Sequence, residues 1–484
     1  MRATLVLFSA FASAQSNDLA VKSQRAKEFM AEGRFAEAVP IYQELVKALP
    51  ANPGLHLNLG LALQMSGQLA DAVPEFQRVL KAEPSNFPAL LSLGATYLSL
   101  NEPAKAIPIL DKAVTTQPAD PNPRGMLANA LLALDRPKEA AVHFRKLSAL
   151  TPTEPKAWFG LGRCYEALAT AAFDELTKSA QDSPEWLTLL AETRASRRQY
   201  RAAFYFYRQA LEAKSGLRGV HSALAAIYRA TDHPAWAEIE TKKEAALPPP
   251  NCAAEKPECD FRAGKLLDVA NAKSSYWQTR AYNALALDAF TKLSALPESV
   301  ELHTLLADIA AGRGQFLDAA KEWRAAVKLD PADTRLEGEL AAALYQAHDY
   351  QAALPLLQAQ LKRFPASAEF NFYLGDCYLR LEQPGKAIEY LEIAAKLDPK
   401  QLPIRASLGL TLMKLERPKE AVDHLDAALV IDDDGSLHYQ LVRAYQAAGE
   451  SEKAKEVLAE YQKIQQSNEA AKRDLDEKVK ITEP

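Results

Sequence analysis

The sequence predicts an all-α protein in which helix-turn-helix units stack into an α-solenoid, arranged in two arrays. Three observations predict this fold. Alanine recurs at intervals of 34 residues, and proline recurs in phase with it. The chain also has 484 residues, whereas a single hydrophobic core stops growing at about 250–300 residues. A long chain with a short internal period is typical of a stacked repeat.

Alanine marks one position of the predicted unit. The alanines in phase are Ala38, Ala72, Ala106, Ala140, Ala203, Ala237, Ala319, Ala353, Ala387, Ala421 and, one residue short of the interval, Ala454. In most units a small residue such as Gly60 lies twelve residues earlier, and a bulky one such as Phe76 lies four residues later. Two helices approach closely only where side chains are small, so these positions indicate a crossing of paired helices.

Proline marks the end of each unit. The prolines in phase are Pro50, Pro84, Pro118, Pro152, Pro331, Pro365 and Pro399. Because proline lacks a backbone N–H and clashes with the preceding turn, it stops the second helix of the pair. Neither helix can bury its apolar face alone, so neighbouring units must complete the core.

Two stretches carry the pattern most fully, residues 59–84 and 374–399. The first has Leu59, Gly60, Leu63, Ala72, Phe76, Val79 and Pro84, and the second has Leu374, Gly375, Tyr378, Ala387, Leu391, Ala394 and Pro399. The chain therefore resembles the tetratricopeptide repeat family over about residues 19–468. The resemblance implies a right-handed solenoid whose first helices line a concave surface that binds a protein or peptide.

The phase of the repeat divides the chain into predicted regions. Residues 19–248 form an N-terminal array of about seven units, the fifth irregular, and 300–468 form a C-terminal array of about five. Between them, 249–299 is an irregular helical insertion with a loop rich in Pro and Cys, and 469–484 is a charged tail. The irregular stretches 164–178 and 281–295 resemble each other and lack Gly or Pro at the internal turn, so each is expected to lie in one longer helix.

The four cysteines fall into two classes. Cys164 and Cys377 occupy a position that holds small residues in other units, so both are predicted to be buried and inert. Cys252 and Cys259 lie on the loop rich in proline, without the further ligands of a zinc site and without redox C-x-x-C spacing. In an exported protein a disulfide is the simplest interpretation, and it would stabilise the fold by ~2–3 kcal/mol.

The first residues indicate export. Arg2 precedes a short apolar run, and the sequence ASA at 12–14 is typical of a cleavage site. Residues 1–14 are therefore predicted to be a signal peptide, which places the chain in the periplasm or outside the cell. The alternative is an unprocessed cytoplasmic protein, because a single basic residue, Arg2, is weak support for a signal peptide. No later apolar run approaches the ~20 residues of a membrane-spanning helix.

The sequence contains no recognisable catalytic motif. The eight histidines are scattered without metal-binding spacing, and no phosphate-binding loop, dinucleotide fingerprint or nucleophile elbow is present. We therefore expect no enzyme activity, no metal and no cofactor. The net charge of −5, with acids and bases interspersed, also argues against nucleic acid as a partner.

Positions that face the groove in the tetratricopeptide repeat family give the candidate binding residues. They are Leu57, Asn58, Leu61, Met65, Leu91 and Met126 in the N-terminal array, and Tyr345, Phe372, Tyr373, Arg380, Tyr439 and Arg443 in the C-terminal array. Aromatic and Arg side chains on a groove are common anchors of binding. The alternative is that the aromatic residues pack between neighbouring first helices.

These features favour a non-catalytic scaffold, located in the cell envelope, that binds a protein or peptide in its grooves. The alternative function is an accessory protein that binds a carbohydrate or another envelope polymer, because aromatic side chains also stack on sugar rings.

Overall fold

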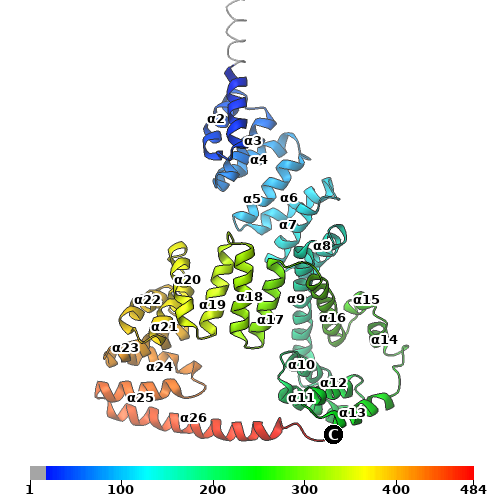
Figure 1. Ribbon diagram of the computed structural model, residues 1–484, viewed down its shortest axis with the longest axis vertical. Helices are drawn as coiled ribbons and strands as arrows, with labels where there is room; N and C mark the ends of the chain where they lie inside the picture. The colour runs from blue at the N-terminus through cyan, green and yellow to red at the C-terminus, as the bar shows by residue number, and fades with distance from the viewer. Residues whose placement is uncertain (1–17) are drawn as a thin grey trace, which may run out of the picture. The chain divides into compact units, whose positions relative to one another are not determined.

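The computed structural model describes residues 18–484, so the predicted signal peptide lies outside the described residues. Within that range every regular element is helical (Figure 1). The packing forms two compact units: unit 1 comprises residues up to 172 together with 260–296, and unit 2 comprises 173–259 together with 297–484. The prediction of an all-α solenoid of paired helices is confirmed.

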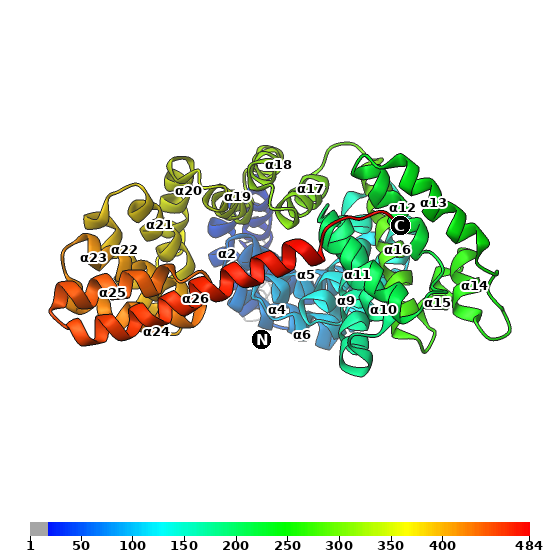
Figure 2. The same cartoon turned by 90° about the horizontal axis from the view of Figure 1, so that it is seen from below.

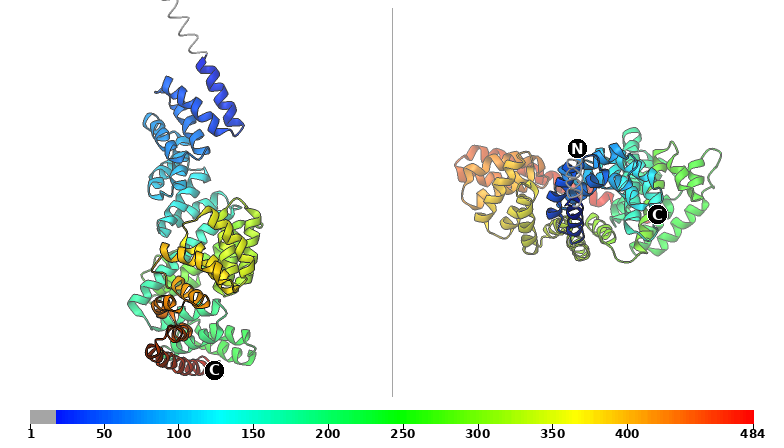
Figure 3. Two further views of the ribbon diagram at one scale, coloured as in Figure 1. Left: turned by 90° about the vertical axis from the view of Figure 1, so that its left-hand side faces the viewer. Right: turned by 90° about the horizontal axis from the view of Figure 1, so that it is seen from above.

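Unit 1 consists mainly of antiparallel helix pairs that follow one another along the chain (Figures 1 and 3). Its helices are one over 18–31, α2 (Phe35–Ala48), α3 (Pro53–Met65), α4 (Leu69–Ala82), α5 (Phe87–Ser99), α6 (Pro103–Thr116), α7 (Pro121–Ala133), α8 (Pro137–Leu150), the first part of α9 (Pro155–Ala180), α15 (Leu266–Ala270) and α16 (Ser275–Ser294).

Unit 2 contains the remaining pairs, beginning with α10 and α11. Its helices are α10 (Pro184–Ser196), α11 (Tyr200–Ala213), α12 (Val220–Ala230), α13 (Pro234–Ala246), α17 (Val300–Gly312), α18 (Phe316–Leu329), α19 (Thr334–Gln346), α20 (Tyr350–Arg363), α21 (Ala368–Arg380), α22 (Pro384–Leu397), α23 (Leu402–Lys414), α24 (Pro418–Ala428), the short η1 (Leu429–Ile431), α25 (Ser436–Ala448) and α26 (Ser451–Lys478). The short α14 (Lys256–Arg262) crosses the boundary between the units.

Local sequence explains where many of these helices begin and end. First helices start after a side chain that caps the free backbone N–H groups, as Asn52 does for Leu55 and Ser367 does for Phe370. Within the unit, the first helix ends at a residue in the left-handed conformation, such as Gly67 or Asn101, with φ of 81° and 57°. This turn lets the second helix run antiparallel to the first.

The alanines in phase lie at the helix crossings. All are buried, with at most 3% of their surface exposed. The small residue and the bulky residue of the pattern meet across the same crossing: a Cβ atom built on Gly60 would lie 2.7 Å from the Phe76 ring. The spacing seen in the sequence is therefore the spacing of close contacts between the two helices of a unit.

The two irregular stretches lie in longer helices, as predicted. Helix α9 has 26 residues and α16 has 20, and the start of α9 has no second helix directly after it. Instead, Phe290 of α16 fills the space above Gly162 of α9, as Phe76 fills the space above Gly60. The Tyr165 and Tyr282 rings also stack, with centroids 6.2 Å apart. Helix α16 thus serves as the missing second helix of the fifth unit of the repeat.

This pairing explains why the compact units do not follow the order of the predicted arrays. Residues 260–296, part of the predicted insertion, pack with unit 1, whereas α10 to α13, assigned by phase to the N-terminal array, pack with unit 2. Sequence phase identifies pairs of helices, but it does not say which pairs share a core.

The predicted disulfide loop is closed. Cys252 and Cys259 are bonded in the structure, with Cα atoms 5.7 Å apart. Arg218 holds the same loop, because its guanidinium donates to Glu255 and Glu258 over 2.5–2.8 Å. Cys164 and Cys377 are buried, and burial raises the pKa of each thiol to about 12, so neither is a reactive thiolate near neutral pH.

A polar pair recurs beneath the first helix of several units, always 19 residues apart. In three repeats the pair is a histidine with a glutamate: His56 with Glu75, His221 with Glu240, and His303 with Glu322. The Nδ1 atom of His303 lies 2.7 Å from Oε2 of Glu322. In two units arginine and histidine take these positions: Arg124 with His143, and Arg405 with His424. The buried Nδ1 atoms of His143 and His424 have no hydrogen-bond partner among the described residues.

These two histidines predict loss of stability in acid. Burial, followed by the charge of Arg124 or Arg405, lowers the pKa of His143 and of His424. Below the unfolded histidine pKa of ~6.5 the unfolded chain therefore binds more protons, so the stabilisation present above that pH is lost as pH falls toward the folded pKa. We expect hydrogen exchange, corrected for intrinsic rates, to accelerate in α7–α8 and α23–α24 between pH 7.5 and 5.5.

The control for this prediction is a variant that cannot titrate. His143→Gln should abolish the acid response of α7–α8 and leave that of α23–α24 unchanged. An acid response in α7–α8 that persists in His143→Gln would contradict the assignment.

Candidate functional site: a groove along the first helices

The predicted N-terminal groove residues lie on successive first helices of unit 1. Leu57, Asn58 and Leu61 of α3 are half-buried, as are Leu91 of α5 and Met126 of α7, whereas Met65 is 57% exposed. Leu57, Leu61 and Met126 also pack against the hydrophobic core. This surface is mainly apolar, and only part of it is open to solvent.

In unit 2 three predicted residues form one aromatic cluster. The Tyr345 ring of α19 lies 4.7 Å from the Tyr373 ring and 6.3 Å from the Phe372 ring, both on α21. All three side chains are half-buried, and burial raises the pKa of the Tyr373 hydroxyl to about 12. For these residues the structure supports the alternative interpretation, that aromatic side chains pack between neighbouring first helices.

A buried carboxylate joins three first helices beneath the groove. Asp376 of α21 is only 1% exposed and accepts hydrogen bonds from Tyr345 Oη of α19 at 2.8 Å and from Ser407 Oγ of α23 at 2.6 Å. Arg380 Nε donates to the same carboxylate at 3.2 Å. Because hydrogen bonds to a charged group are strong where water is excluded, this network fixes the spacing of the three helices.

The open part of the groove lies beside this network. A cavity of about 410 Å³ is lined by Leu379 and Arg380 of α21, Met413 and Lys414 of α23, and Arg443 of α25, among others. A second cavity of about 570 Å³ shares Arg380 and further lining residues with it. The structure thus brings the predicted residues Arg380 and Arg443 to one cavity, whose lining does not include the aromatic cluster of Tyr345, Phe372 and Tyr373.

The cavity carries excess positive charge. Lys414 pairs with Glu382, with Nζ and Oε2 2.6 Å apart, and Arg380 pairs with Asp376. Among the described residues the guanidinium of Arg443 donates a hydrogen bond only to the side-chain oxygen of Gln440, at 3.2 Å. One cation therefore faces the cavity without an ion-pair partner among residues 18–484.

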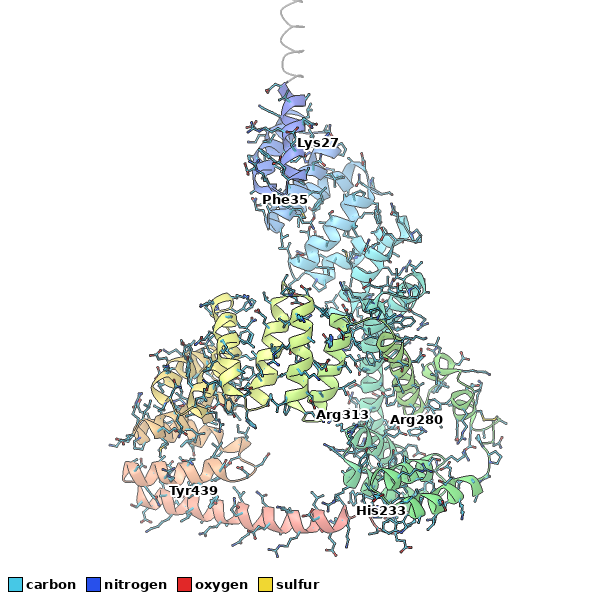
Figure 4. All side chains as sticks on the ribbon, in the orientation of Figure 1. Lys27, Phe35, His233, Arg280, Arg313 and Tyr439 are labelled. Carbon is cyan, nitrogen blue, oxygen red and sulfur yellow. A yellow bond between two sulfur atoms is a disulfide. The ribbon has the colours of Figure 1, made fainter. Side chains whose placement is uncertain are left out.

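Tyr439 lines neither cavity, although it lies one helical turn before Arg443 on the same helix. It lies on α25, in the last helix pair (Figure 4), and 47% of its surface is exposed. Its ring rests against Tyr461 of α26, with centroids 5.7 Å apart. The structure therefore supports Tyr439 from one side and leaves much of its ring accessible.

Family models described as tetratricopeptide repeat match several parts of the chain. They match residues 29–97, 63–130 and 97–158 with one model, 339–401 with a second and 435–460 with a third. These matches fall on helix pairs of both units. The chain belongs to the tetratricopeptide repeat family.

Solved structures that match parts of the chain include MamA and TTC0263, the latter described as a tetratricopeptide repeat protein. MamA (residues 41–end) from Desulfovibrio magneticus RS-1 is 25% identical, with a TM-score of 0.29, over 30% of this chain and 82% of that chain. A MamA structure from strain MSR-1 is 26% identical over 31% and 85%, with a TM-score of 0.29. TTC0263 from Thermus thermophilus is 18% identical over 37% and 99%, with a TM-score of 0.30. A search of curated protein sequences finds no match.

Some cavity-lining residues were not among the predicted ones. Leu410, Met413 and Lys414 of α23 line the cavity, and they occupy the ninth, twelfth and thirteenth positions of their tetratricopeptide repeat. Those are groove-facing positions in the family, so the repeat phase contained the signal. Asp376 also occupies the ninth position of its repeat, yet it is buried because its neighbours supply three hydrogen-bond donors.

Membrane-spanning helices and metal clusters are both absent from residues 18–484. In that range no helix is both long and apolar enough to cross a membrane. The same residues contain no group of three or more His, Cys, Asp or Glu side chains placed to hold a metal ion.

Proposed function

We propose that this tetratricopeptide repeat protein is a non-catalytic scaffold that binds an extended peptide segment of a partner protein along α21, α23 and α25. The observation that carries the proposal is the cavity of about 410 Å³ on these three first helices. Its walls combine the apolar side chains of Leu410 and Met413 with the cation of Arg443. This combination suits a peptide that presents apolar side chains next to a carboxylate.

The aromatic residues favour a peptide over a carbohydrate. A sugar-binding platform needs an open ring face, but the Tyr345, Phe372 and Tyr373 rings are half-buried against one another. Tyr439 is the more accessible of the predicted aromatic residues, and a single ring gives little area for a polymer. Retention of the protein on a polysaccharide matrix, lost in Tyr439→Ala, would support the carbohydrate function instead.

The location of the scaffold is a separate proposal. We propose that the protein acts in the periplasm or outside the cell, because the disulfide between Cys252 and Cys259 suits an oxidising compartment. N-terminal sequencing of the native protein should find a chain that begins near Gln15. A retained Met1 would contradict export.

The experiment on function places a photo-crosslinking amino acid at Met413 in the native cell and, as a control, at the exposed Met65 of α3. A partner that is captured from position 413 but not from position 65 is then purified. Its affinity is measured for the unchanged protein and for the variants Arg443→Ala and Tyr439→Ala. We expect each variant to bind at least about 10-fold more weakly, because truncating a binding anchor costs ~2 kcal/mol or more.

A matched control is Glu452→Ala, which removes an exposed side chain from the start of α26. It should keep full affinity. If Arg443→Ala and Tyr439→Ala fold normally and also bind fully, the C-terminal groove is not the binding site. Capture from Met65 rather than Met413 would move the site to the apolar N-terminal groove.

A further inference from the structure

A tyrosine occupies the same position in several first helices, and its hydroxyl normally forms a hydrogen bond with a side chain of the preceding repeat. The Tyr97 and Tyr378 hydroxyls accept hydrogen bonds from glutamine side chains 20 residues earlier, at 3.0 and 2.9 Å. Tyr228 of α12 occupies the same position but has a different partner. Its hydroxyl donates to the backbone carbonyl oxygen of Thr482, at 2.7 Å and 254 residues away.

Other contacts of the same segment reach the same part of unit 2. Ile481 packs against the hydrophobic core formed by α10 to α13, and Val479 is buried with 8% exposure. Arg201 of α11 donates to the Asp476 backbone oxygen at 3.2 Å and to its carboxylate at 3.3 Å. Figure 2 shows α26 running from the α24–α25 pair toward α10 and α11, where this segment begins.

The segment lies in this site as an extended peptide. Helix α26 ends at Lys478, and residues 479–484 form no regular element. Val479 is buried, Lys480 is exposed and Ile481 is half-buried, which is the alternation of an extended chain lying on a surface. Tyr228 itself is held in place by the rings of Phe204 and Trp236, at 5.7 and 5.6 Å. The acceptor that it binds belongs to the backbone, so any residue at 482 could supply it.

We propose that the edge of α11 and α12 is a peptide-binding site, distinct from the groove of α21, α23 and α25, which accepts an extended segment with apolar side chains at alternate positions. Residues 479–482 of this chain occupy it as an internal ligand. Ile481 supplies the apolar anchor, and the carbonyl of Thr482 satisfies the Tyr228 hydroxyl that has lost its usual partner.

This contact changes the mechanics of unit 2. In a simple stack each repeat touches only its neighbours, so distant repeats are not coupled. Here the last helix is tied to α11 and α12. Because the ligand is attached to the same chain, its effective concentration is high, and a weak intrinsic affinity is enough to fill the site. A partner segment with the same alternation would compete with residues 479–482 and release α26.

The first test uses the full chain and hydrogen exchange of α11 and α12. Ile481→Ala should make the backbone amides of α11 and α12 exchange at least threefold faster, whereas Lys480→Ala, which alters the exposed neighbour, should change nothing. Tyr228→Phe should accelerate exchange in 479–484. The matched variant Tyr378→Phe, at the same repeat position, should leave that segment unaffected. Unchanged exchange in Ile481→Ala would overturn the proposal.

The second test measures binding directly. A fluorescent peptide of residues 474–484 is titrated into a chain that ends at Lys478, after circular dichroism has confirmed its helical content. We expect saturable binding, at least 10-fold weaker binding to the full chain, whose site is occupied, and no binding of the peptide with Ile481→Asp. Equal binding to the full and shortened chains, or to both peptides, would overturn the proposal. If the shortened chain does not fold, the exchange experiment decides.

Discussion

Replacing Phe144 by alanine is expected to lower the free energy of unfolding of its part of unit 1 by ~3–5 kcal/mol, the usual cost of deleting a buried aromatic side chain. Phe144 of α8 is 2% exposed. Its ring also fills the space beside Gly160 of α9, where a Cβ atom would overlap it. Truncation therefore leaves a cavity between two successive repeats, those of α8 and α9. The helix backbones around this cavity have little freedom to close it.

Hydrogen exchange measured peptide by peptide checks this prediction. Val142→Ala on the same helix is the control, because Val142 is 44% exposed and its truncation should cost little. In Phe144→Ala, exchange should accelerate first in α7, α8 and the start of α9, since contacts in a stack are between neighbours. Equal loosening of α19–α25, which belong to the other unit, would count against this picture.

Replacing Asp376 by alanine should destabilise the repeats around α21 by about 3 kcal/mol, because hydrogen bonds to a charged group contribute ~1.5–3 kcal/mol and several are lost together. The variant leaves the Tyr345 and Ser407 hydroxyls buried without their acceptor. It also removes the link that holds α19, α21 and α23 at a fixed spacing. We therefore expect the groove to lose both stability and its affinity for a partner.

A graded series tests the role of this carboxylate. Tyr345→Phe removes one of the hydrogen bonds to this charged group and should cost ~1.5 kcal/mol in chemical denaturation of unit 2. Glu382→Ala removes an acid whose side chain is 74% exposed and paired with Lys414, and such surface pairs contribute at most ~1 kcal/mol. If Asp376→Ala proved as mild as Glu382→Ala, the network would not be what fixes the groove.

Much of the candidate groove could be predicted from the sequence, but its internal division could not. The repeat phase placed Arg380 and Arg443 on groove-facing positions, and both line the cavity. The same phase placed Tyr345 there too, yet its hydroxyl is committed to Asp376. Position in the repeat says which way a residue points. Whether its polar atoms are already paired depends on side chains in the neighbouring repeats.

The sequence by itself determined what is local and repeated in this protein. A small residue and a bulky residue at fixed spacing, such as Gly60 and Phe76, must meet wherever two adjacent helices cross, so their periodicity identifies the fold. The burial of Cys164 and Cys377 follows from the same phase.

Only the tertiary structure decided the contacts between segments far apart in the chain. The ring of Phe290 completes the repeat that begins with α9, and the Thr482 carbonyl binds the Tyr228 hydroxyl in place of the glutamine side chain that binds Tyr97 and Tyr378. Each of these contacts joins residues more than 100 positions apart and occurs once, so it has no period for the sequence to display. Such a contact forms because a repeat can leave a space unfilled or a hydroxyl unpaired. A side chain or carbonyl of a distant segment then fills that space or pairs with that hydroxyl.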